Sequence, residues 1–192
     1  MTRETILNFS QGKAEPVWLQ ERRLQALEQI DKLPLPKIER VKFHRWNLGD
    51  GTIAESQVSA NVPDFSSLSA NPKLVQVGTQ TILESMPAHL AEQGVIFTDF
   101  YSALEEIPEL IETFFGKALP FNEDKLAAYH TAYFNSAAVL YVPDNVELDL
   151  PVEGIFLQDS DSSVPFNKHI LIIAGKNSKV SYLERFQSIG QG

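Results

Sequence analysis

The strongest constraint on the fold of this chain is a repeated pattern in its last third. Residues 140–157 and 169–183 consist of short β-branched runs, which break at small polar turns at 143–145 and 175–178. Such runs are typical of strands stacked in a wound β-structure, where each turn of strands buries the apolar face of its neighbour. Because the pattern is still running at Gly192, we expect the chain to be the front part of a longer protein.

Composition narrows the classes of function. The hydrophobic content of 43% and charged content of 21% are ordinary for a soluble globular protein. The 16 Lys and Arg residues against 25 Asp and Glu give a net charge of −9, which disfavours binding to nucleic acid. The chain has no cysteine, so it contains no disulfide, thiolate nucleophile or cysteine-ligated zinc or iron–sulfur site.

The chain carries no recognisable targeting segment. Residues 1–10 lack the apolar core of a signal peptide, and no apolar run approaches the roughly 20 residues of a membrane span. We therefore predict a soluble, cytoplasmic protein without a membrane span.

The first half of the chain reads as helical and mixed structure. Residues 1–14 are polar and are predicted to form a flexible arm. Pro16 suits the first turn of a helix, and apolar spacing predicts that helix over 17–32, with the prolines in 33–36 ending it. Residues 41–46 alternate like a strand, 47–51 form a turn, and 52–58 resume extended structure.

Shorter elements follow. We predict a hairpin of 73–77 with 80–83, a short helix over 87–93 that Gly94 ends, and a strand at 95–97. Ser102 and Glu105 match a capping box for a helix that breaks at Pro108 and restarts. Asn122 is a candidate cap for a further helix through Phe134.

Several short segments stand out when they are taken together and in order. They are EPVWLQERRLQAL at 15–27, LPLPK at 33–37, RW at 45–46, GVIFTD at 94–99, KLAAYHTAYFN at 125–135, LYVPDNV at 140–146 and LPV at 150–152. These segments resemble the SufB/SufD family of the SUF iron–sulfur cluster assembly system, and they lean to its SufD branch. The resemblance runs from about residue 15 to the last residue.

The resemblance implies an α+β fold in which an N-terminal helical and mixed domain leads into the first turns of a right-handed parallel β-helix. We accordingly expect a flexible N-terminal arm at 1–14, a helical and mixed domain at 15–135 and a truncated β-helix core at 136–192. It also implies a SufB-like subunit and a SufC-type ABC ATPase as partners of the full-length protein. The residues that handle sulfur and iron in the family lie later in the β-helix, so no functional residue is carried over.

The four histidines offer no metal motif. His44, His89, His130 and His169 stand in none of the spacings used by metal-binding helices or strands. We interpret each as a packing or solvent-facing residue and expect no metal or cofactor site in this segment.

Acidic runs receive the same interpretation. Residues 159–163 (DSDSS) hint at calcium but lack the glycine and terminal glutamate of an EF-hand loop, so a solvated loop is favoured. The other carboxylates are interpreted as two solvent-exposed faces. One lies on a helix and consists of Glu105, Glu106, Glu109 and Glu112, and the other lies along a strand and consists of Asp144, Glu147 and Asp149. No pair is marked out for acid–base catalysis.

One adjacent pair is a candidate for partner binding. Arg45 beside Trp46 fits an interface anchor, against the alternative of a core tryptophan covered by an arginine stem.

Taken together, the resemblance and the absence of a catalytic motif favour a non-catalytic scaffold segment with no catalytic residues. A carbohydrate-active enzyme on a β-helix, a generic protein-interaction module and a homo-oligomer remain open alternatives.

Overall fold

The computed structural model describes residues 3–45, 52–67 and 69–191, which form two compact units. The helical unit consists of Met1–Ala54 and Glu109–Asn135, and the β unit consists of Glu55–Pro108 and Ser136–Gly192. The β unit thus resumes at Ser136, where the sequence predicts the wound β-structure to begin, but it also takes in an earlier segment. That segment lies inside the domain predicted over 15–135.

The elements follow one another in mixed order. The helices are α1 (Arg3–Gly12), α2 (Val17–Gln29), the 3₁₀ turn η1 (Phe43–Arg45), α3 (Ala88–Ala91), α4 (Phe100–Glu106), α5 (Pro108–Phe114) and α6 (Lys125–Tyr133). The strands are β1 (Lys73–Val77), β2 (Gln80–Ser85), β3 (Ile96–Asp99), β4 (Ser136–Val142), β5 (Val152–Asp159), β6 (Lys168–Ala174) and β7 (Tyr182–Ile189). The α+β class predicted from the sequence is confirmed.

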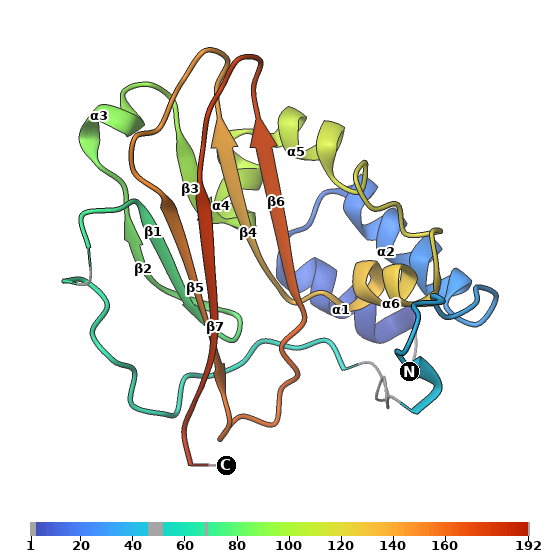
Figure 1. Ribbon diagram of the computed structural model, residues 1–192. Helices are drawn as coiled ribbons and strands as arrows, with labels where there is room; N and C mark the ends of the chain where they lie inside the picture. The colour runs from blue at the N-terminus through green and yellow to red at the C-terminus, as the bar shows by residue number, and fades with distance from the viewer. Residues whose placement is uncertain (1–2, 46–51, 68, 192) are drawn as a thin grey trace. The chain divides into compact units, whose positions relative to one another are not determined.

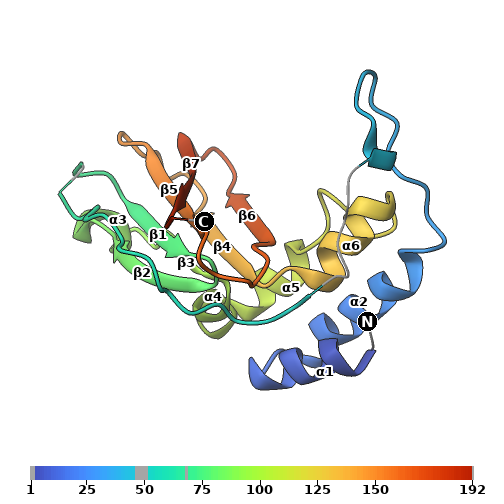
Figure 2. The same ribbon diagram turned by 90° about the horizontal axis from the view of Figure 1, so that it is seen from below.

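Helix α2 organises the helical unit. Pro16 stands at its N-cap with φ −64°, and the helix ends before the proline-rich segment 33–36, as predicted. It packs against α6 and α1, which lies beside it in Figure 2. The shared core joins apolar side chains from all three helices, which are Ile6, Leu24, Ala26, Ala132 and Tyr133, with Ile53 from the extended segment that begins at residue 52.

A buried ion pair joins the middle of α2 to Glu15, which precedes the helix. Arg23 is fully buried, and its Nε and Nη2 donate to the two oxygens of Glu15 at 2.8 and 2.7 Å. Its Nη1 donates to the carbonyl of Phe134 at 2.9 Å, and the guanidinium group stands 3.9 Å from the Phe134 ring centroid. Burying these charges is tolerated because both are paired and hydrogen-bonded.

Three expectations in the helical unit are corrected. The predicted arm is wrong for residues 3–12, which form α1, because Ile6 turns inward to the core and is fully buried. The predicted strand at 41–46 is wrong, since residues 43–45 form η1 around the buried Phe43; Trp46 lies outside the described residues. Helix α6 is capped by Asp124, whose carboxylate accepts from Ala127 N at 2.8 Å, and not by Asn122.

The β unit holds two mixed sheets. One has the order β2-β1-β5-β7 and the other β3-β4-β6. The hairpin β1–β2 is antiparallel, as predicted, and β3 pairs antiparallel with β4. All other pairings, β1 with β5, β5 with β7 and β4 with β6, are parallel. Figure 1 shows β4 and β6 as neighbouring arrows.

The chain alternates between the sheets, so β4 and β5 are repeated by β6 and β7. Ser136 at the start of β4 pairs with Lys168 at the start of β6, and Val152 pairs with Tyr182 in the same way. The turns are also superposed: Asn145 and Asn177 both have left-handed backbones, with φ of 62° and 56°. The Asn177 amide donates to the Asn145 side-chain oxygen at 3.2 Å. The two similar segments of the sequence therefore lie one upon the other in register.

Apolar residues of both sheets form the core of the β unit. The buried cluster is Leu74, Leu90, Val95, Phe97, Ala138, Leu140, Val142, Leu148, Val152 and Phe156. Strands β4 and β5 are buried almost throughout, whereas β6 is mostly half-buried and β7 is mostly exposed. Burial thus decreases toward the edge of each sheet that β6 or β7 forms.

Local signals around the short helices of the β unit are partly as predicted. Gly94 adopts φ +83° after α3, and α4 and α5 meet at the break before Pro108. The capping box of Ser102 is wrong. Asp99 is the N-cap of α4, accepting from Tyr101 N and Ser102 N, because the helix already begins at Phe100.

Candidate interaction surface and pocket

The four histidines differ in exposure and do not gather in one place. His44 and His89 are exposed, while His130 and His169 are half-buried. His44 and His130 belong to the helical unit, and the other two to the β unit. Within residues 3–45, 52–67 and 69–191, no three His, Asp or Glu side chains gather in a way that could hold a metal ion.

The carboxylates predicted to face solvent are exposed, but one of the two groups does not lie on the strand predicted for it. Those of α4 and α5 (Glu105, Glu106, Glu109 and Glu112) all face solvent. Asp144, Glu147 and Asp149 are exposed too, although they belong to the connection between β4 and β5 rather than to a strand. Solvation explains both groups without a ligand.

Asp159 contradicts the solvated-loop interpretation of residues 159–163. It ends β5, is 1% exposed, and its Oδ2 accepts from Ser59 N at 2.9 Å, Ser59 Oγ at 2.8 Å and Ala60 N at 3.2 Å. These hydrogen bonds, first of all that from the Ser59 backbone, lower the pKa of Asp159 to about 2. Asp159 therefore anchors the segment around residue 59 to the end of β5.

A polar group lies among the apolar side chains of the β unit. Lys168 Nζ donates to Gln76 Oε1 and, at 3.2 Å, to Ser136 Oγ, and it lies 4.0 Å from the Phe156 ring centroid. Burial lowers the pKa of Lys168 well below its ordinary value, although the charges of Glu184 and Asp99 oppose this.

The edges formed by β6 and β7 are the clearest interaction surface of the β unit, and we call them the open edge. A strand at the edge of a sheet presents backbone N–H and C=O groups on its free side. Large apolar side chains accompany them, with Ile172 42%, Leu183 48% and Phe186 56% exposed. Ile172 pairs with the buried Leu140, and Phe186 with the buried Phe156, so each continues an apolar row.

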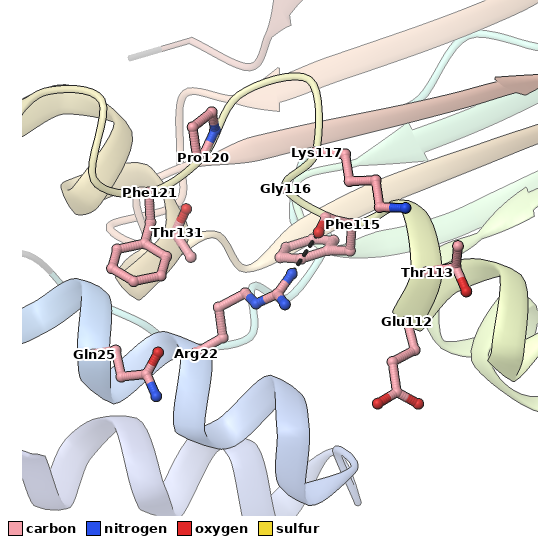
Figure 3. A pocket seen from close by; sticks show the side chains of 10 residues that line it. All are labelled: Arg22, Gln25, Glu112, Thr113, Phe115, Gly116, Lys117, Pro120, Phe121 and Thr131. Carbon is pink, nitrogen blue, oxygen red and sulfur yellow. Dashed lines mark hydrogen bonds between the residues drawn. The ribbon is translucent and has the colours of Figure 1, made fainter.

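A separate pocket of about 370 Å³ lies in the helical unit (Figure 3). Its lining mixes charged, polar and aromatic side chains: Arg22, Gln25, Glu112, Thr113, Phe115, Gly116, Lys117, Pro120, Phe121 and Thr131. Arg22 Nη1 donates to the Phe115 carbonyl, and the guanidinium carbon stands 5.5 Å from the Trp18 ring centroid and 5.8 Å from that of Phe115. We call this the Arg22 pocket.

Sequence reasoning did not find this pocket. The pair Arg22–Arg23 is conspicuous in the sequence, but no aromatic patch adjoins it locally. Phe115 arrives from a distant part of the chain, after α5. One local signal was present, since Trp18 and Arg22 lie one helical turn apart and such residues share a helix face.

Membrane insertion finds no support in the helices: none in the described part of the chain is both long and apolar enough to cross a bilayer.

Comparison with known proteins decides the family. The protein-family model described as SufBD protein N-terminal region matches residues 54–153 of this sequence. The iron-sulfur cluster assembly protein SufD of Bacillus subtilis (strain 168) is 34% identical over 197 residues, which cover 96% of this chain. The chain belongs to the SufBD family. The resemblance noted from the sequence segments is thereby confirmed.

Other relatives carry the same family name at lower identity. An iron-sulfur cluster assembly SufBD family protein of Staphylococcus haemolyticus is 27% identical over 202 residues, again covering 96% of this chain. The chain spans 45% of the Bacillus protein and 43% of the Staphylococcus protein.

Proposed function

We propose that this chain is the N-terminal portion of a non-catalytic scaffold subunit that serves iron–sulfur cluster assembly. Membership of the SufBD family is the observation that carries this proposal, because relatives over nearly the whole chain are named as cluster assembly proteins. The described residues add no group of side chains that could hold a metal ion. The scaffold role that we propose does not depend on a cluster ligand within this segment.

The architectural part of the proposal is that β4–β7 are the first turns of a right-handed parallel β-helix. The alternation between two sheets supports it, as does the parallel pairing of each strand with the next but one, β4 with β6 and β5 with β7. So do the superposed asparagine turns. In such a coil the open edge is where the next turn of strands pairs.

The partners proposed for the full-length protein are a SufB-like subunit and a SufC-type ABC ATPase, in a complex located in the cytoplasm. The net charge of −9 supports protein partners over nucleic acid. Self-association through the open edge is the alternative that an affinity experiment has to separate.

Affinity isolation of the tagged natural protein from its own cell extract tests the complex. We expect a SufB-like subunit and an ABC ATPase to co-elute in fixed ratio after a high-salt wash. Elution of the protein alone, or only with further copies of itself, would count against the complex. Turnover of a polysaccharide by the purified protein would instead favour the carbohydrate-active alternative.

A matched pair of variants tests the coil. Ile172 on β6 and Ile82 on β2 are 42% and 41% exposed, and each lies on a strand at the edge of its sheet. If a further turn covers β6 in the natural full-length protein, Ile172→Lys buries a charge and lowers the melting temperature much more than Ile82→Lys. Equal effects of the two substitutions would contradict a continued coil at β6.

A further inference from the structure

The Arg22 pocket has unused binding capacity at its cationic end. Arg22 Nη1 donates one hydrogen bond to the Phe115 carbonyl. Within the described part of the chain, the other N–H groups of Arg22 donate no hydrogen bond. Two aromatic rings, those of Trp18 and Phe115, hold the guanidinium group in place. A fixed guanidinium fork with free donors matches the two oxygens of a carboxylate.

Thr131 adds a second polar group to the pocket. The residue is 7% exposed and lines the cavity, but its hydroxyl is not a buried unpaired group, because Glu153 Oε2 is the one such atom among the described residues. In the view of Figure 3 its side chain stands between Phe121 and the Arg22 guanidinium group. A hydroxyl that lines a cavity can donate one hydrogen bond to an acceptor on a bound molecule.

The walls of the pocket are apolar and aromatic. Phe115 is 2% exposed and Phe121 is half-buried, and Pro120 lies next to Phe121. Small-molecule sites are commonly cavities of about 300–1,000 Å³ that combine apolar walls with a few polar groups. The 370 Å³ of the Arg22 pocket lie at the small end of that range.

Charge favours an anion here in spite of the acidic chain. Arg22 and Lys117 outnumber Glu112 among the lining residues, whereas the whole chain carries −9. In Figure 3 the Glu112 carboxylate and the Lys117 ammonium group both point away from the centre of the pocket, which leaves the Arg22 guanidinium group as its central charge. With one guanidinium group at its centre, the pocket suits a single negative charge better than a phosphate.

We propose that the Arg22 pocket binds a carboxylate attached to an aromatic or bulky apolar group. Arg22 and the Thr131 hydroxyl hold the carboxylate, and Phe115 and Phe121 enclose the apolar part. Such a ligand has two sources with the same chemistry, a free aromatic carboxylic acid or the C-terminal residue of a protein chain.

Calorimetric titration of the natural full-length protein separates these sources. The probes are N-acetyl-phenylalanine, its uncharged carboxamide, 3-phenylpropionate and inorganic phosphate. We expect N-acetyl-phenylalanine to bind at least tenfold more tightly than the carboxamide, because only the acid pairs with Arg22. Comparable binding of 3-phenylpropionate assigns the site to a free acid, and much weaker binding assigns it to a chain terminus.

Variants make the test independent of folding. Thr131→Val should weaken N-acetyl-phenylalanine binding about fivefold, which corresponds to one neutral hydrogen bond, while the melting temperature stays equal or rises. Arg22→Gln should weaken binding at least tenfold. The exposed Lys32 does not line the pocket, so Lys32→Gln is the control and should bind like the unchanged protein.

Several results would overturn the proposal. They are equal binding of acid and carboxamide, tighter binding of phosphate than of either acid, and unchanged binding in Thr131→Val together with Arg22→Gln. Absence of binding by both acids at millimolar concentration would overturn it as well.

Discussion

Replacing Arg23 by methionine should strongly destabilise the helical unit. Methionine keeps most of the buried stem, so the substitution mainly removes charge and hydrogen bonds. The Glu15 carboxylate, whose side chain is 0% exposed, then loses the two guanidinium bonds of 2.8 and 2.7 Å. Breaking a buried ion pair by removing one partner costs about 3–5 kcal/mol, so we expect Arg23→Met to lower the free energy of unfolding by about 4 kcal/mol.

The double variant separates the charge from the packing. Glu15→Leu combined with Arg23→Met removes the stranded carboxylate, and replacement of a buried pair by apolar residues is often neutral. The carbonyls of Ala132 and Phe134 still lose their donor, at distances of 3.3 and 2.9 Å in the unchanged protein. We therefore expect the double variant to lose only about 2 kcal/mol.

Equilibrium urea unfolding, followed by the fluorescence of Trp18 in α2, measures both values. The control is Arg3→Met, which removes an exposed ion pair to Glu28 at 3.8 Å and should cost less than about 0.5 kcal/mol. A loss below about 1 kcal/mol for Arg23→Met, or a double variant less stable than the single one, would refute the reasoning.

Three further predictions concern the β unit. The pKa of Asp159 is lowered from 3.8 to about 2, so its carboxylate stabilises the fold above pH 3.8, and this contribution is lost as the pH falls toward 2. Thermal unfolding at a series of pH values should therefore show a smaller loss of stability in acid for Asp159→Asn than for the unchanged protein. The pKa of Lys168 is lowered in the folded state, so between this lowered pKa and 10.5 the folded protein binds fewer protons than the unfolded chain. The free energy of unfolding should therefore rise with pH in that window. Urea unfolding of Lys168→Met should not show this rise. Gly78 has φ +53°, and an added Cβ would clash with Ser56 Oγ, so Gly78→Ala should cost about 2 kcal/mol in thermal unfolding; Gly12→Ala, with nothing within 4 Å, should be neutral or slightly stabilising.

The elements that could be predicted from the sequence are those with strong local signals. Pro16 and the prolines of 33–36 bound α2, and Gly94 ends the turn after α3 with a left-handed backbone. The hairpin β1–β2 follows from two short runs around Gly78. In each case the residues that determine the structure are adjacent in the chain.

Two of the errors have different physical causes, a competition between local signals and support from tertiary packing. Asp99 and Ser102 both offer cap oxygens, and Asp99 takes the position while the Ser102 hydroxyl donates to its Oδ2 at 2.6 Å. Helix α1 has a short apolar face, which gains its stability from packing on α2 rather than from its own composition. Such tertiary support is invisible in a polar N-terminal segment.

Contacts between residues far apart in the chain could not be predicted from the sequence. The parallel pairing of β1 with β5 joins Lys73 to Glu153, and the Arg22 pocket joins α2 to the segment after α5. The burial of Asp159 likewise depends on Ser59, which lies far earlier in the chain. Periodicity and turn chemistry do not encode these partners.

Structure determination of the natural full-length protein is the most direct test of the scaffold proposal. We predict that the next two strands of the chain pair parallel with β6 and β7. The first should follow β6 at about the separation between Ser136 and Lys168, and the second should follow β7 at about the separation between Val152 and Tyr182. The exposed Phe186 and Ile172 would then be buried. Free or antiparallel-paired edges at β6 and β7 would contradict the proposed coil and the scaffold built on it.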